Sequence, residues 1–252
     1  MKNIVLLGAT GSIGDSCLNV IRQNKDHFHL FAIGLGGNLD KAQQIAKEFS
    51  PEYIFIAESH LDKSHDLLQS HSNILNTENE LQALIQDSSV DIVISAISGF
   101  AGLKASYFAI DAGKTILIAN KESIVAAGDI LMPLAQTKNS EIIPVDSEHN
   151  AIHQCFAPHR DLKEISKIMI TASGGPFREK TFKELSGVTL KDALKHPTWN
   201  MGTKITIDSA TLVNKCLELI EAHYLFQIPE SQIEIVVHPQ SIIHSMVTFI
   251  DG

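Results

Sequence analysis

Cysteine is scarce in this chain. Its 252 residues include three cysteines, Cys17, Cys155 and Cys216, which lie far apart and form no Cys-x-x-Cys pair. That spacing argues against a zinc ribbon and a disulfide framework, and it predicts a protein of the reducing cytoplasm. No apolar run reaches the roughly 20 residues that cross a bilayer, and the run after Met1 is too short for a signal peptide. We therefore expect a cytoplasmic protein without a membrane partner.

Positive charge is also in short supply. Lys and Arg number 20 against 29 Asp and Glu, which gives a net charge of −9. Nucleic acids and anionic membrane surfaces attract basic proteins, so this balance argues against both as partners. A phosphate-bearing ligand would have to be held by local groups. The hydrophobic fraction, 44%, is enough for a full core.

A glycine-rich turn follows the first apolar run. Ile4–Leu7 has the character of a buried strand, and Gly8-Ala9-Thr10-Gly11-Ser12-Ile13-Gly14 comes directly after it. A helix is expected from about Ser12 to Gln23. Strand, glycine turn and helix in this order are typical of a dinucleotide site, where amides at the helix N-terminus bind the pyrophosphate. An ordinary strand-to-helix turn is the alternative. The core face of the helix is expected to carry Ile13, Cys17, Val20 and Ile21.

The second turn bears on the choice of nucleotide. A strand at about Leu30–Ile33 ends in Gly34-Leu35-Gly36-Gly37-Asn38, and the first acidic residue after it is Asp40. An NAD site would carry Asp or Glu at the strand end to bind the ribose 2′-hydroxyl. The uncharged turn leaves space for a 2′-phosphate and favours NADP. Since the turn carries no arginine, the preference is expected to be modest.

The alternation of strands and helices predicts the fold class. Further strands are expected at 53–57, 91–96, 114–119 and 141–145, with a helix at about 100–112. Five or six such units predict a doubly wound, Rossmann-type parallel sheet. After about residue 145 the pattern changes, and strands are expected at 167–171, 204–207, 233–237 and 245–250. An α/β chain with a second, α+β domain follows from this change.

The most informative stretch is Asp146-Ser147-Glu148-His149-Asn150, which follows the strand at 141–145. Ligands of α/β proteins gather beyond the carboxyl ends of strands. In an extended segment Asp146 and Glu148 would share one face and aim at one point. Two carboxylates suit a hard cation such as Mg²⁺ or Mn²⁺. The alternative is a polar turn that caps the next helix through Ser147 or Asn150.

Two later clusters are polar as well. Ser173 with Gly174 and Gly175 could form an amide nest for an anion, although an ordinary turn explains the pattern equally well. Asp208 to Thr211 is expected to cap a helix, with Ser209 at its N-terminus. The core face of that helix is expected to carry Val213, Cys216 or Leu217, Ile220 and Tyr224. Off that face, at helical spacing, lie Asn214, Lys215, Glu218 and Glu221.

Taken in order, these motifs resemble one family. They are Gly8–Gly14, Asn120-Lys121-Glu122-Ser123, Val145–Ile152, Ser173–Arg178, His196-Pro197 with Trp199 and Met201-Gly202, Asp208–Thr211 with Asn214-Lys215, and His238–Ser241. The chain is similar throughout its length to the 1-deoxy-D-xylulose-5-phosphate reductoisomerases. That resemblance implies an oxidoreductase and isomerase of isoprene biosynthesis that uses NADPH and Mg²⁺ or Mn²⁺.

The resemblance also implies an organisation. Residues 1–145 would form the NADPH-binding Rossmann domain, and residues 146–252 the catalytic domain that binds metal and substrate. The family's C-terminal helical domain is expected to be absent from this chain. The partners would be a sugar-phosphate substrate, 1-deoxy-D-xylulose 5-phosphate, and a second copy of the chain in a homodimer. The product would be 2-C-methyl-D-erythritol 4-phosphate.

Residue roles follow only from the matched motifs. The metal ligands implied are Asp146, Glu148 and Glu218; spacing alone would allow Glu221 in place of Glu218. Lys121 would join these three in catalysis. The cofactor would contact Thr10, Gly11, Ser12, Ile13, Gly36, Gly37, Asn38, Asn120, Glu122 and Gly202. The substrate would contact Ser147, Glu148, Ser173, His196, Trp199, Ser209, Asn214, Lys215 and Glu218.

The polar segment at about 178–202 is expected to be a mobile loop that covers the substrate. Trp199, the only tryptophan, would then shield the substrate from water; a core position for the indole is the alternative.

Two other functions fit parts of the pattern. An NADP-linked dehydrogenase of the semialdehyde or homoserine type would share the N-terminal plan but would need no Asp-x-Glu metal pair. A cofactor-binding fragment without catalysis is the other alternative. Dependence of turnover on a divalent cation separates the first from the reductoisomerase.

Overall fold

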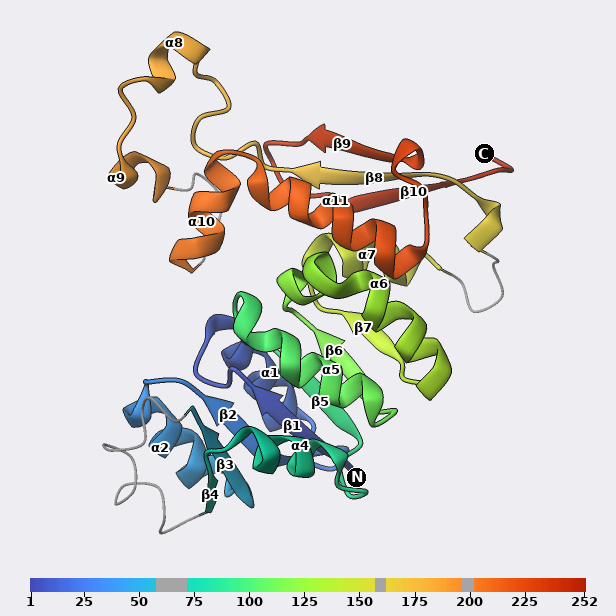
Figure 1. The fold of residues 1–252 in the computed structure, drawn as a ribbon. Helices are drawn as coiled ribbons and strands as arrows, with labels where there is room; N and C mark the ends of the chain where they lie inside the picture. The colour runs from blue at the N-terminus through green and yellow to red at the C-terminus, as the bar shows by residue number, and fades with distance from the viewer. Residues whose placement is uncertain (58–71, 157–161, 196–201) are drawn as a thin grey trace. The chain divides into compact units, whose positions relative to one another are not determined.

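The computed structural model describes residues 1–57, 72–156, 162–195 and 202–252. The chain divides into two compact units, Met1–Ile143 and Pro144–Gly252. Each unit has its own sheet and its own hydrophobic core (Figure 1).

The first unit is built on a seven-stranded sheet of order β4-β3-β2-β1-β5-β6-β7, in which the neighbours from β4 to β6 pair in parallel. Its strands are β1 (Lys2–Leu7), β2 (Phe28–Leu35), β3 (Tyr53–Ile56), β4 (Asn73–Leu75), β5 (Ile92–Ser95), β6 (Thr115–Ile118) and β7 (Ile142–Pro144). Its helices are α1 (Ser12–Gln23), α2 (Leu39–Phe49), α4 (Glu78–Gln86), η2 (Phe100–Gly102), α5 (Leu103–Asp111) and α6 (Lys121–Lys138).

The order of the strands makes this sheet doubly wound. From β1 the chain runs outward through β2 and β3 to β4, and it then returns to β5 on the other side of β1. Right-handed crossovers taken in opposite directions place their helices on opposite faces of the sheet. The Rossmann-type sheet expected from the sequence is confirmed. Its switch point lies between β1 and β5, where open α/β sheets bind ligands.

Helix α1 spans the predicted residues, and its predicted core face is half right: Cys17 and Ile21 pack on the core, but Ile13 and Val20 do not. Gly14, Leu18 and Ile21 are buried, whereas Ile13 is 38% and Val20 52% exposed. Gly14 lies so close to the preceding turn that a Cβ there would be 2.3 Å from the Ala9 carbonyl oxygen. The prediction followed the bulky apolar residues, but Gly14 is buried because its backbone packs directly against the turn that precedes the helix.

The second unit has a three-stranded sheet of order β10-β8-β9. Strand β8 (Ile165–Ala172) pairs in parallel with β9 (Ile233–Val237) and antiparallel with β10 (Ser245–Phe249). Ile152 from α7 (Ser147–Cys155) and Phe226 from α11 (Val213–Phe226) pack with the β8 isoleucines in one core. The remaining elements are η3 (Leu162–Glu164), α8 (Phe182–Leu185), α9 (Leu190–Ala193), α10 (Thr203–Ala210) and η4 (Glu230–Gln232).

The strand expected at Lys204–Ile207 is wrong, because Thr203–Ala210 forms helix α10. Gly202 is its N-cap, and the Thr206 hydroxyl donates to the Gly202 carbonyl oxygen at 2.9 Å. An ion pair of 2.8 Å joins Lys204 to Asp208 one turn later. These local contacts outweigh the strand preference of the β-branched residues in the segment.

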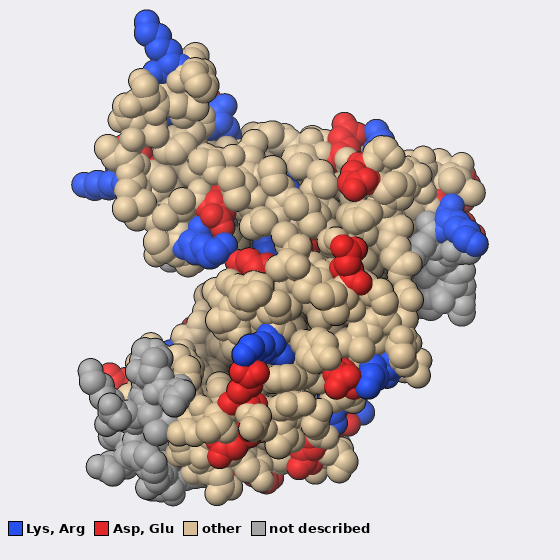
Figure 2. Space-filling model, in the orientation of Figure 1, with Lys and Arg blue, Asp and Glu red and all other residues tan. Residues whose placement is uncertain are grey.

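Charges of both signs are interspersed on the face of the molecule drawn in Figure 2. Among the helices of the described ranges, none has the length and apolar character needed to cross a bilayer.

Candidate active site

A cavity of about 520 Å³ lies at the switch point of the first sheet. Gly8 and Thr10 line it from the turn after β1, Gly36 from the turn after β2, and Ala96 from the turn after β5. Gly8 has a φ of +87°, and a Cβ there would be 2.3 Å from the Ala96 carbonyl oxygen. Only glycine lets these two turns meet.

The glycine turn leads directly into α1. Gly11 is the N-cap, so Ser12 and Ile13 stand in the first turn, where backbone N–H groups have no partner within the helix. Thr10 and Gly11 line the cavity itself. The four residues assigned to the pyrophosphate therefore lie together, and the donors suit an anion.

Helix α2 starts beside the second turn and carries a cation, Lys41, that was not among the predicted site residues. Asn38 is the N-cap, and its side-chain oxygen accepts a hydrogen bond from the Lys41 backbone N–H at 3.2 Å. The Lys41 ammonium donates to the Thr10 carbonyl oxygen at 3.0 Å and to Asp15 at 2.6 Å. It therefore ties the turn at Gly36, Gly37 and Asn38 to the glycine turn. Its position four residues after Gly37 was a signal that the prediction left unused.

Asn120 has a clear structural task. It is 1% exposed and caps α6, accepting from the Ser123 backbone N–H at 2.9 Å. Its amide also donates to the carbonyl oxygens of Ile97, at 2.5 Å, and Gly99, at 2.7 Å. Ile97 lines the cavity, so Asn120 braces the cavity wall. The next residue, Lys121, is 6% exposed, and Glu122 is half-buried.

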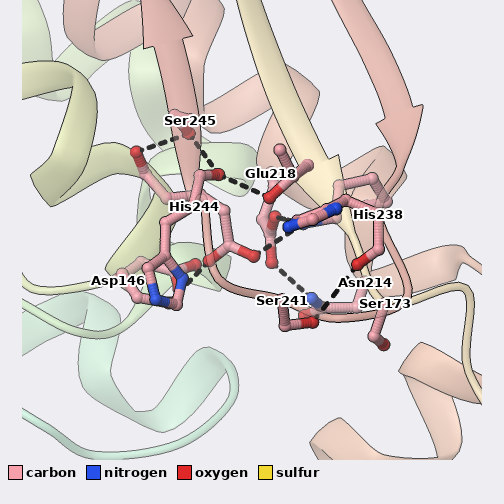
Figure 3. Close-up of polar contacts among 12 residues, drawn as sticks. Asp146, Ser173, Asn214, Glu218, His238, Ser241, His244 and Ser245 are labelled. Atoms are coloured by element: carbon pink, nitrogen blue, oxygen red, sulfur yellow. Dashed lines mark hydrogen bonds and ion pairs between the residues drawn. The ribbon is translucent and has the colours of Figure 1, made fainter.

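Three carboxylates meet in a second cavity, of about 410 Å³, within the second unit. Asp146, Glu148 and Glu218 each offer an oxygen, and these atoms lie within 4.8 Å of one another. The Lys215 ammonium is 2.9 Å from Glu148 and also contacts Glu218, which accepts from the Asn214 amide as well. Figure 3 shows Glu218 and Asn214 directed toward the same space as Asp146.

The two carboxylates of the Asp-x-Glu stretch converge for a different reason from the one predicted. Ser147 begins helix α7, so Asp146 is its N-cap and Glu148 lies in its first turn. The extended geometry expected for this stretch is therefore wrong. Neither Ser147 nor Asn150 caps the helix; the Ser147 hydroxyl donates to Glu148 at 2.7 Å, and the Asn150 amide to the Pro144 carbonyl oxygen at 2.9 Å.

Helix α11 buries the face that was predicted to be polar and outward. Val213 is 47% and Ile220 37% exposed, and Cys216 is exposed. Its buried residues are Asn214, Lys215, Glu218, Glu221, Ala222 and Phe226. The helix turns its polar side inward because Asn214, Lys215 and Glu218 line the cavity and pair with one another there. Glu218 lines the cavity, whereas Glu221, fully buried, faces His149.

The residues that were assigned to the phosphate come from two helices and a glycine pair; together they are called the anion end of the cavity. Ser173, Ser209, Asn214 and Lys215 all line it. Ser209 belongs to the last turn of α10 and is not at a helix N-terminus as predicted; α11 begins at Val213 after Leu212, which has a φ of +62°. Gly174 and Gly175 have φ values of +83° and +67°, and the Gly175 N–H lies 3.4 Å from the Ser173 hydroxyl oxygen.

We expect Gly175→Ala to lower the free energy of unfolding by about 1–3 kcal/mol and to disturb the anion end. The added Cβ would lie 2.5 Å from the Ser209 carbonyl oxygen, in a left-handed backbone that disfavours alanine. Denaturant unfolding followed by circular dichroism measures the loss. Gly187→Ala is the matched control, since a Cβ there meets no atom within 4 Å. Equal stability of the two variants would contradict this account of Gly175.

Several residues of the cavity were missed by the sequence analysis. Thr171, Ser241 and His244 line it, and Figure 3 shows the last two beside Asp146 and Asn214. The Ser245 hydroxyl donates to the Glu148 carbonyl oxygen at 2.9 Å and so ties β10 to α7. His238-Pro239-Gln240-Ser241 was part of the resemblance, but no pattern in the sequence showed that the loop before β10 returns to the carboxylates.

Three predictions reach beyond this geometry. His196 and Trp199 lie outside the described residues, and so do residues 196–201 of the loop expected at about 178–202. Gly202, assigned to the cofactor, is exposed and begins α10 in the second unit.

The acidic cavity suits a divalent cation. Three carboxylates and one ammonium leave the cluster with two negative charges, and all the candidate ligand atoms are oxygens. Hard ions such as Mg²⁺ and Mn²⁺ prefer such donors.

Comparison with known proteins decides the family. Residues 4–128 match the family model for 1-deoxy-D-xylulose 5-phosphate reductoisomerase. Residues 142–226 match the model for the C-terminal domain of the same enzyme. This chain belongs to the 1-deoxy-D-xylulose 5-phosphate reductoisomerase family.

Individual reductoisomerases match over the whole chain. The enzyme of Francisella tularensis subsp. novicida is 48% identical over 99% of this chain, and that of Bacillus cereus AH187 is 48% identical over 100%. The chain spans 65% and 66% of these two relatives, so about a third of each has no counterpart here.

Solved reductoisomerase structures have the same fold. One, in complex with NADPH, fosmidomycin and magnesium, superposes with a TM-score of 0.94 at 41% identity; this chain covers 65% of it. The Zymomonas mobilis enzyme in complex with NADPH gives 0.90 at 43% identity. A homoserine dehydrogenase from Thiobacillus denitrificans gives 0.56 at 18% identity, which shows a shared fold alone. The dehydrogenase alternative is not favoured.

Proposed function

We propose that this chain carries out the NADPH- and metal-dependent conversion of 1-deoxy-D-xylulose 5-phosphate to 2-C-methyl-D-erythritol 4-phosphate, a reaction of isoprenoid synthesis. The observation that carries the proposal is the cavity in which Asp146, Glu148 and Glu218 meet beside Lys215, with Ser173 and Ser209 in the same wall. A cation site and a phosphate site in one small cavity are what a short sugar phosphate requires.

The chemistry of the side chains indicates which residues would bind the cation, which the phosphate and which the cofactor. Asp146, Glu148 and Glu218 would hold the cation, which when bound polarises the substrate's carbonyl and hydroxyl oxygens. Ser173, Ser209, Asn214 and Lys215 would bind the phosphate through hydroxyl, amide and ammonium donors. NADPH, which supplies the hydride, would lie along the glycine turn of the first unit.

The family implies further assignments, which we propose with the same function. Lys121 and Ser147 would contact the reacting end of the substrate, and His196 and Trp199 would cover it. Asn120, Glu122 and Gly202 would complete the cofactor site. Residues 1–145 would act as the NADPH-binding domain and residues 146–252 as the catalytic domain. The working protein would be a cytoplasmic homodimer.

The decisive experiment is NADPH oxidation, followed at 340 nm, with the sugar phosphate in the presence and absence of Mg²⁺ or Mn²⁺. Turnover that requires both the sugar phosphate and the cation is the expected result. Because the chain spans 65% of its relative, a cofactor-binding fragment is the second candidate. NADPH binding without turnover would favour it.

We expect NADPH to bind more tightly than NADH, and Lys41→Ala to remove most of the difference. The Gly36-Gly37-Asn38 turn carries no cation of its own, and the Lys41 ammonium, which lies on the Thr10 carbonyl oxygen and Asp15, would supply one near the 2′-phosphate. A hydrogen bond to a charged group contributes about 1.5–3 kcal/mol, so NADPH affinity should fall tenfold or more while NADH affinity changes little. Titration of both cofactors by fluorescence measures this. Lys47→Ala, an exposed residue in the last turn of the same helix, is the control. Equal losses for both cofactors would show that Lys41 only supports the fold.

A further inference from the structure

A histidine and a glutamate lie behind the carboxylate cluster and take no part in the roles above. His149 and Glu221 are both 0% exposed. Glu221 is on the same helix as Glu218, and spacing alone had allowed either one as the third metal ligand. The structure gives Glu221 a different neighbour: its carboxylate lies 3.5 Å from the His149 Nδ1.

The His149 ring touches every segment that carries a candidate ligand. Its Nε2 lies 2.8 Å from the backbone carbonyl oxygen of Glu218. Its Nδ1 lies 3.8 Å from the Asp146 carboxylate, and His149 follows Glu148 directly in α7. A single rigid ring therefore joins the start of α7 to the middle of α11, the two places from which the carboxylates come.

The contacts fix the orientation of the ring. A carbonyl oxygen can only accept, so the hydrogen bond to Glu218 requires a hydrogen on Nε2. The opposite ring nitrogen is then directed at Asp146 and Glu221. The Phe226 ring is stacked beside the imidazole, with centroids 6.3 Å apart and an interplanar angle of 12°. The hydrogen bond at Nε2 and the stacked Phe226 ring fix the plane of the imidazole, so its Nδ1 stays directed at the two carboxylates.

The complete burial of the Glu221 carboxylate is energetically costly. Burying a charged glutamate costs more than burying a neutral side chain of the same size, unless a partner offsets it. The Glu221 carboxylate lies 3.5 Å from the His149 ring, and His149 in turn faces Asp146. In metal sites, residues that contact the ligands without touching the metal orient those ligands, and their loss lowers the metal affinity strongly.

We infer that His149 and Glu221 are positioning residues, which hold Asp146 and the Glu218 segment in the arrangement that binds the divalent cation. The inference rests on the metal site proposed above. Glu221 fixes the imidazole, and the imidazole fixes Asp146 relative to α11.

The test is Mn²⁺ binding to the whole chain without substrate, measured from the electron paramagnetic resonance signal of free Mn²⁺. Glu221→Gln keeps the size of the side chain and removes its charge. We expect this variant to remain folded by circular dichroism and to bind Mn²⁺ at least tenfold more weakly than the unmodified chain. Glu234→Gln, at an exposed ion pair with Lys167, is the matched control and should bind Mn²⁺ normally.

Two results would overturn the inference. One is unchanged Mn²⁺ affinity in folded Glu221→Gln. The other is binding of two ions by the unmodified chain and one by the variant, which would make Asp146, His149 and Glu221 a ligand set of their own. Failure of the proposed metal site is a distinct result: the unmodified chain and Glu148→Gln would then bind Mn²⁺ equally poorly.

If Glu221→Gln does not fold, the two amide replacements of His149 decide the question. Asparagine can offer a nitrogen near the place of Nδ1, toward Asp146 and Glu221. Glutamine can offer one near the place of Nε2, toward the Glu218 carbonyl oxygen. Positioning through Glu221 predicts several-fold tighter Mn²⁺ binding by His149→Asn than by His149→Gln. Equal affinities would contradict it.

Discussion

Glu148→Gln is expected to abolish metal-dependent turnover while NADPH binding stays intact. Glu148 is one of three carboxylates whose oxygens lie within 4.8 Å of one another. Glutamine keeps the size and can still accept from the Ser147 hydroxyl, now 2.7 Å away, but it removes one of the cluster's negative charges. Losses of supporting groups behind a metal cost about 10–100-fold in affinity, and loss of a direct ligand should cost at least as much.

The measurement is NADPH oxidation over a range of Mg²⁺ concentrations, together with a fluorescence titration of NADPH. Glu179→Gln, at a side chain 87% exposed, is the control and should behave like the unmodified chain. Normal turnover by Glu148→Gln at low Mg²⁺ would mean that the cation is held elsewhere. Loss of NADPH binding as well would mean that the variant is misfolded, which circular dichroism would detect independently.

The first unit was largely predictable because its signals are local. A buried parallel strand reads as an apolar run, and the expected strand after the glycine turn agrees with Phe28–Leu35 to within a few residues. Helix α4 was not predicted, although Thr77 and Glu80 form a capping box at its start. That signal was available and unused.

The second unit was less predictable because its buried polar groups bond to one another in one cavity. Periodicity assumes that apolar residues face inward, yet α11 buries Asn214, Lys215 and Glu218 and exposes Val213. The exchange is possible because these groups satisfy one another across α7 and α11. A contact such as Glu148 with Lys215 joins positions 67 residues apart, and no local pattern reports it.

The same reasoning explains why the carboxylates of the stretch around Asp146 converge as predicted, but through a different backbone geometry. An extended strand would bring the two side chains to one face, and here the N-cap position of Asp146 also lets its oxygen lie within 4.8 Å of a Glu148 oxygen. The residue types indicated a cation site, but they could not distinguish the two backbones. Ser245, which binds the Glu148 carbonyl oxygen from β10, is a long-range partner that fixes the observed one.

Lys215→Met is expected to destabilise the metal-free chain strongly and to make its stability depend on the cation. The Lys215 side chain is 6% exposed, and its ammonium pairs with Glu148 and Glu218, whose side chains are 16% and 2% exposed. Removing one partner of a buried ion pair costs about 3–5 kcal/mol, because the remaining charge stays buried and uncompensated. In this variant Glu148 and Glu218 both lose the Lys215 ammonium, and the two carboxylates also repel each other and Asp146.

A divalent cation should restore most of this loss, since it binds the folded state and neutralises the same carboxylates. Thermal unfolding with and without saturating Mn²⁺ therefore gives a larger rise in the midpoint for Lys215→Met than for the unmodified chain. Lys204→Met, which breaks an ion pair whose lysine is 52% exposed, should cost at most about 1 kcal/mol and show no added response to Mn²⁺. If Lys215→Met were as stable as the unmodified chain without metal, the three carboxylates would not be charged together in the folded state. The electrostatic argument for a cation at this cluster would then fail.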